Sequence, residues 1–284
     1  MKSSVFHNTK ILEQHLAPQR HPLYLAKLVL NATYGSIVKG ISQNASNVLL
    51  RVRILLEPPV LIKDLYYKKE KVMLVKICAN KSVEEAKMCL DAHADVIGIL
   101  VGQEHSSTDF VDKETAKQIC DYVNNRCDVS LVTHLTSADE IIKLTKYIGN
   151  NIIQLHSNID ELEVEKIVNE LPQVKLVRLI HVSTDGKIVT DILKFKFADF
   201  YLLDSFNLKT NQVGGTGLTH DWNKSKELIK QLNKPTFLAG GLNPDNVKVA
   251  ILQANPYGVD VNSGCKVNGK KNAEKVMQFV KNAK

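Results

Sequence analysis

Two side chains could carry proton-transfer chemistry, and each lies near the end of an apolar run. Cys78 closes the run KVMLVKIC, and Asp204 lies near the end of ADFYLLDS. A thiolate can remove a carbon-bound proton, and a carboxylic acid can protonate a sugar oxygen. Taken singly, Cys78 is also typical of a small buried hydrophobe, and Asp204 of a helix cap or a solvated loop. The pair therefore indicates acid–base catalysis if the fold brings both residues to one site.

Glycines follow two later apolar runs, where they could hold an anion. The run KPTFLAGG ends in Gly240 and Gly241, and PYGVDVNSG ends in Ser263 and Gly264. Glycine lets backbone N–H groups approach an anion because no Cβ stands in the way. Ordinary turn glycines are the alternative for either pair alone. Two such loops in succession favour a phosphate site near the end of the chain.

Three further features are candidates for contacts with a substrate. Lys76 lies two residues before Cys78, so both side chains leave a strand on the same face. A lysine inside a sheet is costly unless it is paired, which indicates a polar floor beneath the cysteine. His156 ends the run NNIIQLH and is either a substrate hydrogen bonder or a structural one. The segment VGGTG at 213–217 is either a lid over the substrate or a solvent-exposed loop.

A repeated unit of strand and helix must position these residues. From residue 72 onward, an apolar run and an amphipathic helical stretch alternate eight times, with a weaker helical stretch at 189–196 as the fifth. Continuous apolar strands that alternate with helices are typical of parallel strands covered by helices. Eight units predict a closed (β/α)8 barrel, a TIM barrel. A doubly wound open sheet is the alternative, but its usual glycine-rich first turn is replaced here by ICANKSVEEA.

The barrel fold gives the candidate residues a common location. Active sites of such barrels lie at the C-terminal ends of the strands, and phosphate usually binds in the loops after strands 7 and 8. Cys78 is expected at the end of strand 1 and Asp204 at the end of strand 6. The glycine pairs fall after strands 7 and 8. The sequence therefore predicts that the acid–base pair and the phosphate loops share one mouth of the barrel.

Residues 1–71 do not join this pattern and are expected to form a basic N-terminal extension to a barrel domain at 72–284. The extension carries eleven Lys/Arg and four Asp/Glu, so it accounts for the whole net charge of +7, and the remainder is neutral. Only Glu13 precedes Glu57, which is also typical of a cleavable organellar presequence within 1–56. The long apolar runs of the extension favour a packed accessory segment.

Composition limits the classes of function that the chain can have. A neutral barrel argues against nucleic-acid binding. The sequence contains no run of about 18 apolar residues, so no membrane span is predicted, and the N-terminus lacks the features of a secretory signal. The five cysteines are odd in number and contain no CxxC pair, which argues against a zinc site or a disulfide framework and favours a reducing compartment.

The motifs in order resemble the phosphoribosylanthranilate isomerase family of tryptophan biosynthesis. VKIC, DVIGILV, QLH, LLDS, GGTG, DW, LAGGLNPDNV, GVDVNSG and GKKNAEKVMQFV follow the family's order over about three quarters of the chain. LAGGLNPDNV together with VDVNSG is the most specific part. The resemblance implies a cofactor-free and metal-free Amadori rearrangement, in which an N-(5-phosphoribosyl) arylamine becomes a 1-amino-1-deoxyribulose 5-phosphate.

The resemblance also implies roles for particular residues. The family's catalytic cysteine matches Cys78, which would remove the C2′ proton, and its catalytic aspartate matches Asp204, which would protonate the ring oxygen. The aspartate of its eighth strand matches Asp260, which we expect to contact the substrate together with Lys76 and His156. The phosphate contacts of the family match Gly215, Gly240, Gly241, Asn262, Ser263 and Gly264.

Two departures from the family pattern bear on this interpretation. The family usually has glycine after the cysteine, where this chain has Ala79. The family also carries an arginine after strand 2 that receives the anthranilate carboxylate, whereas this chain reads GQEHSSTDFV at 102–111 and places Asp109 near that position. An acidic side chain there would repel the carboxylate. His105 or a basic residue of the extension is then expected to replace the arginine.

We therefore expect an intramolecular oxidoreductase that acts on a phosphorylated sugar amine. The expected protein binds neither nucleic acid nor membrane, is a monomer or homodimer, and works in the cytoplasm. The same chemistry on a different phosphoribosyl amine is one alternative, and a non-catalytic phosphosugar-binding module is another. Cys78 and Asp204 favour an enzyme, whereas the missing arginine favours the alternatives.

Overall fold

The computed structural model describes residues 73–103, 107–183, 186–207, 212–213, 219 and 221–284. The chain divides into two units, 1–69 and 70–284, and the described residues all belong to the second. The extension and residues 214–217 of the VGGTG segment lie outside the described residues. None of the described helices is long and apolar enough to cross a membrane.

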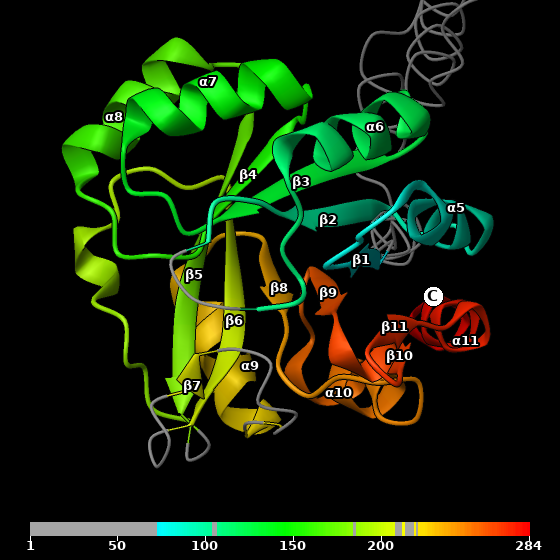
Figure 1. Cartoon of the computed structure of the whole chain (residues 1–284). Coiled ribbons are helices and arrows are strands. Elements are labelled where there is room, and N and C mark those ends of the chain that lie inside the picture. Colours follow the sequence, from blue (N-terminus) through cyan, green and yellow to red (C-terminus); the bar gives the residue numbers. More distant parts are fainter. Residues whose placement is uncertain (1–72, 104–106, 184–185, 208–211, 214–218, 220) are drawn as a thin grey trace, which may run out of the picture. The chain divides into compact units, whose positions relative to one another are not determined.

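Eight parallel strands close into a barrel (Figure 1). Their order around the barrel is β1-β2-β3-β4-β5-β6-β8-β9, and pairing of β9 with β1 completes the ring. The barrel strands are β1 (Leu74–Ile77), β2 (Val96–Leu100), β3 (Asp128–Thr133), β4 (Ile152–Leu155), β5 (Lys175–Ser183), β6 (Phe200–Asn207), β8 (Thr236–Leu238) and β9 (Gly258–Val261). The predicted (β/α)8 barrel is confirmed.

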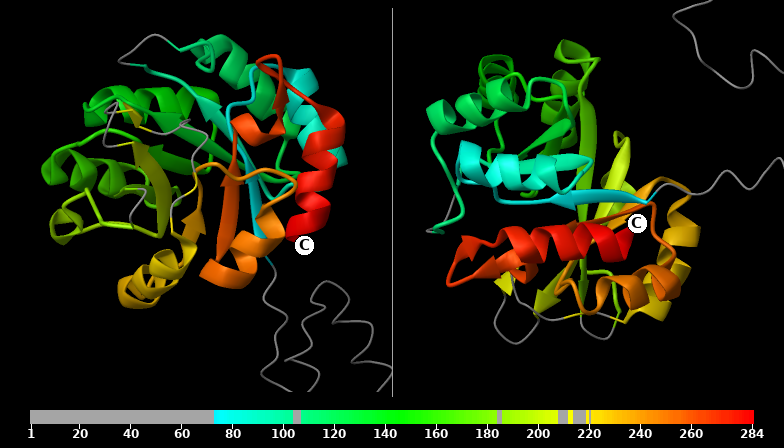
Figure 2. Two further views of the ribbon diagram at one scale, coloured as in Figure 1. Left: turned by 90° about the horizontal axis from the view of Figure 1, so that it is seen from below. Right: turned by 90° about the vertical axis from the view of Figure 1, so that its right-hand side faces the viewer.

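Helices cover the outside of the barrel (Figures 1 and 2). They are α5 (Val83–Asp91), α6 (Lys113–Val123), α7 (Ala138–Ile148), α8 (Glu161–Glu170), α9 (Trp222–Leu232), α10 (Val247–Ala254) and α11 (Ala273–Ala283). Asp112, Asp160 and Asp221 cap the N-termini of α6, α8 and α9 by accepting backbone N–H bonds. α11 lies beside α5, so the last helix closes the ring against the first (Figure 2).

The fifth unit differs from the sequence prediction. Instead of a helix at 189–196, the described residues hold a short 3-10 turn, η1 (Ile192–Lys194). Ile188 forms a bridge with Val182 of β5, and the N–H of Val189 donates to the carbonyl of His181. β-branched residues such as Ile188 and Val189 favour strand pairing over a helix, which explains the difference.

The structure adds short elements after β6 and β9. β6 does not end at Asp204 but continues to Asn207, where it pairs with the antiparallel strand β7 (Gln212–Val213). After β9 come the 3-10 turn η2 (Ser263–Cys265) and a small hairpin of β10 (Lys266–Val267) and β11 (Lys270–Lys271).

The barrel interior changes from apolar to polar along the strands. Val96, Ile152, Val177 and Leu202 belong to an apolar cluster formed largely from the N-terminal halves of the strands. Larger clusters, such as that around Ile141 and Ile167, fill the space between the sheet and the helices. Polar side chains are therefore concentrated toward the C-terminal ends of the strands, where the chemistry was predicted.

Candidate active site

A buried lysine connects two other candidate residues, Cys78 and Asp260, inside the barrel. Lys76 Nζ lies 2.6 Å from Asp260 Oδ2, 2.8 Å from Gln154 Oε1 and 3.6 Å from Cys78 Sγ. Lys76 and Asp260 are register partners in β1 and β9, which explains why the two side chains meet. Burial alone would lower the pKa of Lys76, but the charges of and hydrogen bonds to Asp260 and Cys78 together outweigh this and hold the pKa above its ordinary value. The predicted polar floor beneath Cys78 is thus an ammonium ion with buried partners.

Asp260 retains one free carboxylate oxygen for other partners. Oδ2 accepts from Lys76, whereas Oδ1 is buried and accepts no hydrogen bond from any described residue. A buried acceptor without a donor is unfavourable by about 1–3 kcal/mol. Such an oxygen is well suited to accept a hydrogen bond from a hydroxyl group of a bound sugar.

Asp204 is buried and has the protonation behaviour of a general acid. Burial and, to a smaller extent, the charge of Asp260 raise the pKa of Asp204 to about 6, although the backbone N–H of Ser205 and the charge of Lys76 oppose the rise. The Ser205 N–H donates to Asp204 Oδ1 at 2.8 Å and so fixes the carboxyl group. A carboxyl group with a pKa near neutrality can both donate and recover a proton during turnover.

Cys78 follows β1 directly and is 8% exposed. Burial raises the pKa of its thiol, and the Asp260 charge adds to the rise, whereas Lys76, Lys271 and the N–H of Ala79 act in the opposite direction. Lys271 is buried and donates from Nζ to the carbonyl oxygen of Cys78 at 2.6 Å. The thiol is therefore mostly protonated in the free protein, and the two ammonium groups stabilise the thiolate once it forms.

Two small residues adjoin Cys78, one beside its side chain and one in the turn that follows it. A Cβ at Gly98 in β2 would lie 2.9 Å from Cys78 Sγ and 3.2 Å from Lys76 Cε, closer than ordinary contacts. Ala79 has φ +56°, a left-handed conformation that costs a non-glycine residue about 1–2 kcal/mol. The family's usual glycine would adopt this turn freely. Ala79 therefore keeps the turn after the cysteine at some expense in stability.

The glycines after β8 need their lack of a side chain. Gly240 and Gly241 have φ values of +82° and +65°, and a Cβ on Gly240 would lie 1.8 Å from Ser205 Oγ. Their N–H groups donate to no acceptor among the described residues. A Cβ on Gly264 would lie 1.9 Å from the carbonyl oxygen of Leu242, so this glycine allows the loops after β8 and β9 to touch.

The two loops thus lie together at one end of the barrel, as a phosphate site requires. The predicted phosphate contact Gly215 lies outside the described residues. Asn262 is part of the loop after β9, but its side-chain amide donates to Asp109 Oδ2 at 2.8 Å. One of the two amide N–H donors of Asn262 is therefore taken by Asp109.

His156 follows β4 in a row of aromatic rings across the ends of β2 to β5. Its ring centroid lies 5.0 Å from that of His134 and 6.5 Å from that of His181, and His134 lies 5.2 Å from Phe110. Gln154 joins the row to the lysine, because its Nε2 lies 3.3 Å from His156 Nδ1. Burial lowers the pKa of His181. The rings are tilted against one another, and the row lies at the ends of β2 to β5, away from the glycine loops after β8 and β9.

The structure corrects the expectation for Asp109. This carboxylate is not a lone negative charge, because Lys266 Nζ lies 2.6 Å from its Oδ1. Burial alone would raise the pKa of Asp109, but hydrogen bonds from Lys266 and Asn262, together with the charges of Lys266 and Lys81, hold the pKa below its usual value. His105 lies outside the described residues.

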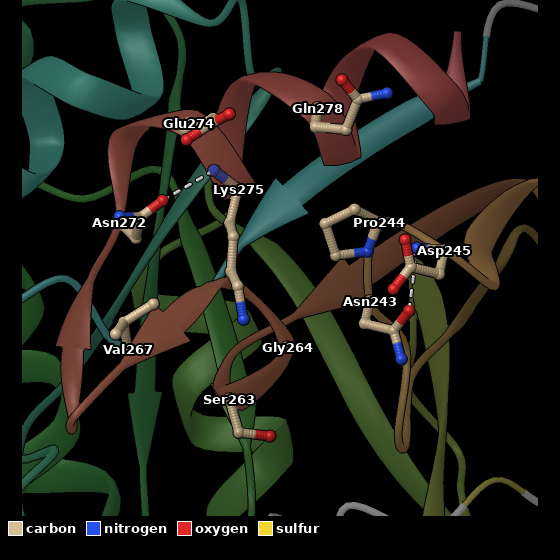
Figure 3. A pocket seen from close by; sticks show the side chains of 10 residues that line it. All are labelled: Asn243, Pro244, Asp245, Ser263, Gly264, Val267, Asn272, Glu274, Lys275 and Gln278. Atoms are coloured by element: carbon tan, nitrogen blue, oxygen red, sulfur yellow. Dashed lines mark hydrogen bonds between the residues drawn. The ribbon is translucent and has the colours of Figure 1, made fainter.

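A hollow of about 580 Å³ adjoins the loop after β9 (Figure 3). Ser263 and Gly264 form part of its lining, together with Asn243, Lys275 and other residues of the β8 loop and α11. Cys78 and Asp204 do not line it. The hollow is therefore distinct from the acid–base pair.

Sequence reasoning missed four residues that shape this site. Gln154, Gly98, Lys271 and Lys266 lie against Lys76, Cys78 or Asp109 in the structure. Gln154 and Gly98 stood within the recognised runs NNIIQLH and DVIGILVG, and their inward orientation follows from strand alternation. No local signal marked the two lysines.

Comparisons with known proteins find similar chains of one family. The family model of N-(5'-phosphoribosyl)anthranilate isomerase matches residues 75–282. N-(5'-phosphoribosyl)anthranilate isomerase 2 of Methanosarcina mazei is 39% identical over 213 residues, which cover 75% of this chain and 94% of that protein. The isomerase of Aquifex aeolicus is 34% identical over 211 residues, covering 74% and 98% of the two chains.

Solved structures of the same kind superpose on the barrel. Phosphoribosylanthranilate isomerase of Thermotoga maritima is 27% identical with a TM-score of 0.65, and covers 75% of this chain and 98% of its own. The Pyrococcus furiosus protein is 30% identical with a TM-score of 0.62, covering 74% and 98% of the two chains.

Proposed function

This chain belongs to the N-(5'-phosphoribosyl)anthranilate isomerase family, and we propose that it converts N-(5'-phosphoribosyl)anthranilate to the corresponding 1-(carboxyphenylamino)-1-deoxyribulose 5-phosphate. The observation that carries the proposal is a buried aspartate with a pKa of about 6, Asp204, in one barrel mouth with a cysteine whose sulfur lies 3.6 Å from an ammonium group. These are the acid and the base that the reaction needs.

The first step opens the sugar ring. Asp204 donates its proton to the furanose ring oxygen, and the bond between this oxygen and C1 breaks. The lone pair of the aryl nitrogen forms the C=N bond of an iminium ion. The raised pKa of Asp204 supports this role, because a carboxyl group of ordinary pKa would hold almost no proton at neutral pH.

The second step moves hydrogen from C2 to C1. The Cys78 thiolate removes the C2 proton, and the C–H electron pair forms a C1=C2 bond while the iminium pair returns to nitrogen. The resulting enaminol gains a proton at C1 and loses its hydroxyl proton, which yields the ketone. No external oxidant or reductant is needed, so the chemistry calls for no redox cofactor.

Lys76 and Asp260 orient the reacting groups in this mechanism. Lys76 Nζ lies beside Cys78 Sγ and would stabilise the thiolate by charge. Asp260 Oδ1, buried and without a described donor, would accept from a sugar hydroxyl. His156, which contacts Gln154, would be a further polar contact for the substrate. The backbone N–H groups of Gly240, Gly241, Ser263 and Gly264 would hold the phosphate, with Asn262 and Gly215 as further predicted contacts.

Other properties follow as part of the proposal. All five cysteines are free, which suits a reducing compartment such as the cytoplasm. The Thermotoga maritima relative is named as dimeric, so both a monomer and a homodimer are open for this chain. For residues 1–71 we propose an accessory segment, with a presequence as the alternative.

Complementation tests the proposed function. A tryptophan auxotroph that lacks this isomerase should grow without tryptophan when it expresses the full chain. Expression of Cys78→Ser or Asp204→Asn at the same level should not restore growth. Failure of the wild-type chain, expressed as folded protein, would contradict the proposal, and the same strain supplied with tryptophan controls for toxicity.

A further inference from the structure

A bridge between the loops after β2 and β9 places a cation beside β1, the strand that precedes Cys78. Both carboxylate oxygens of Asp109 are held from the loop after β9, Oδ1 by Lys266 Nζ at 2.6 Å and Oδ2 by Asn262 Nδ2 at 2.8 Å. β1 lies between β2 and β9 in the barrel order. The bridge therefore joins the two strands that flank β1, whose last residue precedes Cys78.

The Lys266 ammonium group has N–H donors left beyond the one that bonds to Asp109. An ammonium group has three N–H donors, and Asp109 is the one side-chain acceptor that Lys266 Nζ contacts among the described residues. The Lys266 side chain is 9% exposed, so a second anion would meet little competition from water. Lys81 is also close enough to favour the charged form of Asp109. The charges of both lysines thus act on the one carboxylate of Asp109.

An aromatic surface adjoins this cation. Phe110 follows Asp109 directly, pairs with Leu100 at the end of β2, and lies with its ring centroid 5.2 Å from that of His134. A planar ring that bears a carboxylate would find both an aromatic contact and a positive charge at this corner of the mouth. The phosphate loops after β8 and β9 hold the other anion of such a substrate.

We propose that Lys266, oriented by Asp109, is the specificity-determining cation that binds the carboxylate on the aryl ring of the substrate. The inference rests on the proposed isomerase function and deepens it. Asp109 is then a positioning residue that holds the ammonium group, and does not itself repel the substrate. An arginine at position 109 would face Lys266 and repel it, so Asp109→Arg should weaken the site.

The test compares two substrates that differ in the carboxylate alone. One is N-(5'-phosphoribosyl)anthranilate, and the other is the phosphoribosyl derivative of aniline, which lacks the carboxylate. Lys266→Met should lower kcat/KM for the first about 10- to 150-fold, mainly through KM, as expected for loss of a charge-assisted hydrogen bond. It should change kcat/KM for the second less than about threefold. Lys266→Arg should recover most of the loss.

Each outcome has a defined meaning. An equal fall in kcat/KM for both substrates in Lys266→Met would show that Lys266 only shapes the loop. An unchanged kcat/KM for both would show that another group binds the carboxylate. Each result overturns the inference while leaving the isomerase function intact. Inactivity of the wild type on both substrates would overturn the function and the inference together. Lys270→Met, at an exposed neighbouring lysine, serves as the matched control.

Discussion

Replacing Asp204 with asparagine should stabilise the protein while it removes most of the catalytic activity. The folded structure raises the pKa of Asp204 from 3.8 to about 6. Between these values the folded state binds more protons than the unfolded chain, so the free energy of unfolding falls as the pH rises through this window. At about 1.4 kcal/mol per pH unit, the full loss is roughly 3 kcal/mol, and it is reached just above pH 6.

Asparagine carries no charge at any of these pH values and can still accept from Ser205 through its amide oxygen. The stability advantage of Asp204→Asn over wild type should therefore grow by up to about 3 kcal/mol between pH 4 and pH 7. Urea denaturation followed by the fluorescence of Trp222 measures this difference, since Trp222 is the sole tryptophan and lies at the start of α9 in the barrel unit. Asp245→Asn, at an exposed position, is the matched control and should track wild type.

The same pKa predicts the pH profile of the reaction. Below about pH 6 both Asp204 and Cys78 hold protons, so kcat/KM should rise about tenfold per pH unit as the thiolate population grows. Above about 6 the loss of protonated Asp204 offsets the gain in thiolate, and the profile should stay flat up to the raised pKa of Cys78. A stability difference that does not depend on pH, or a profile without a break near 6, would refute the idea that burial keeps Asp204 protonated.

Two further substitutions test the surroundings of the acid–base pair. Lys271→Met removes the buried ammonium group that donates to the Cys78 carbonyl, so it should slow alkylation of Cys78 by iodoacetamide at pH 8 several-fold, as measured by peptide mass spectrometry. Unchanged alkylation would argue against a role for this lysine, and Lys270→Met, at an exposed position, is the control. Gly240→Ala introduces a methyl group 1.8 Å from a β6 side chain and should raise KM about tenfold or more by displacing the phosphate loop. Gly269→Ala has a similar φ of +75° but nothing within 4 Å, so it should leave KM unchanged; an equal rise in both variants would point to backbone strain alone.

The barrel could be predicted from the sequence because its information is local. Eight apolar runs alternate with amphipathic stretches, and closure follows from their number and parallel direction. The weak fifth helix could not be resolved in the same way, since Ile188 and Val189 are compatible with strand pairing and with a helix. Their pairing with β5 is a tertiary effect.

The interior of the site depends on distant pairings that no local pattern contains. Lys76 meets Gln154 and Asp260 across separations of 78 and 184 residues. The strand-1 lysine predicted a polar partner but not which one, because that depends on the register between β1 and β9. Asp109 and Lys266 are 157 residues apart, so the aspartate alone suggested repulsion where the structure has an ion pair.

The central claim is that Cys78 and Asp204 perform the isomerisation, and its most direct test is the turnover of N-(5'-phosphoribosyl)anthranilate by purified variants. Cys78→Ser, Cys78→Ala and Asp204→Asn should each lower kcat about 10²- to 10⁴-fold, the usual effect of losing a general acid or base. Circular dichroism should show that each variant keeps the wild-type fold. Turnover at the wild-type rate by folded Cys78→Ala or Asp204→Asn would contradict the account.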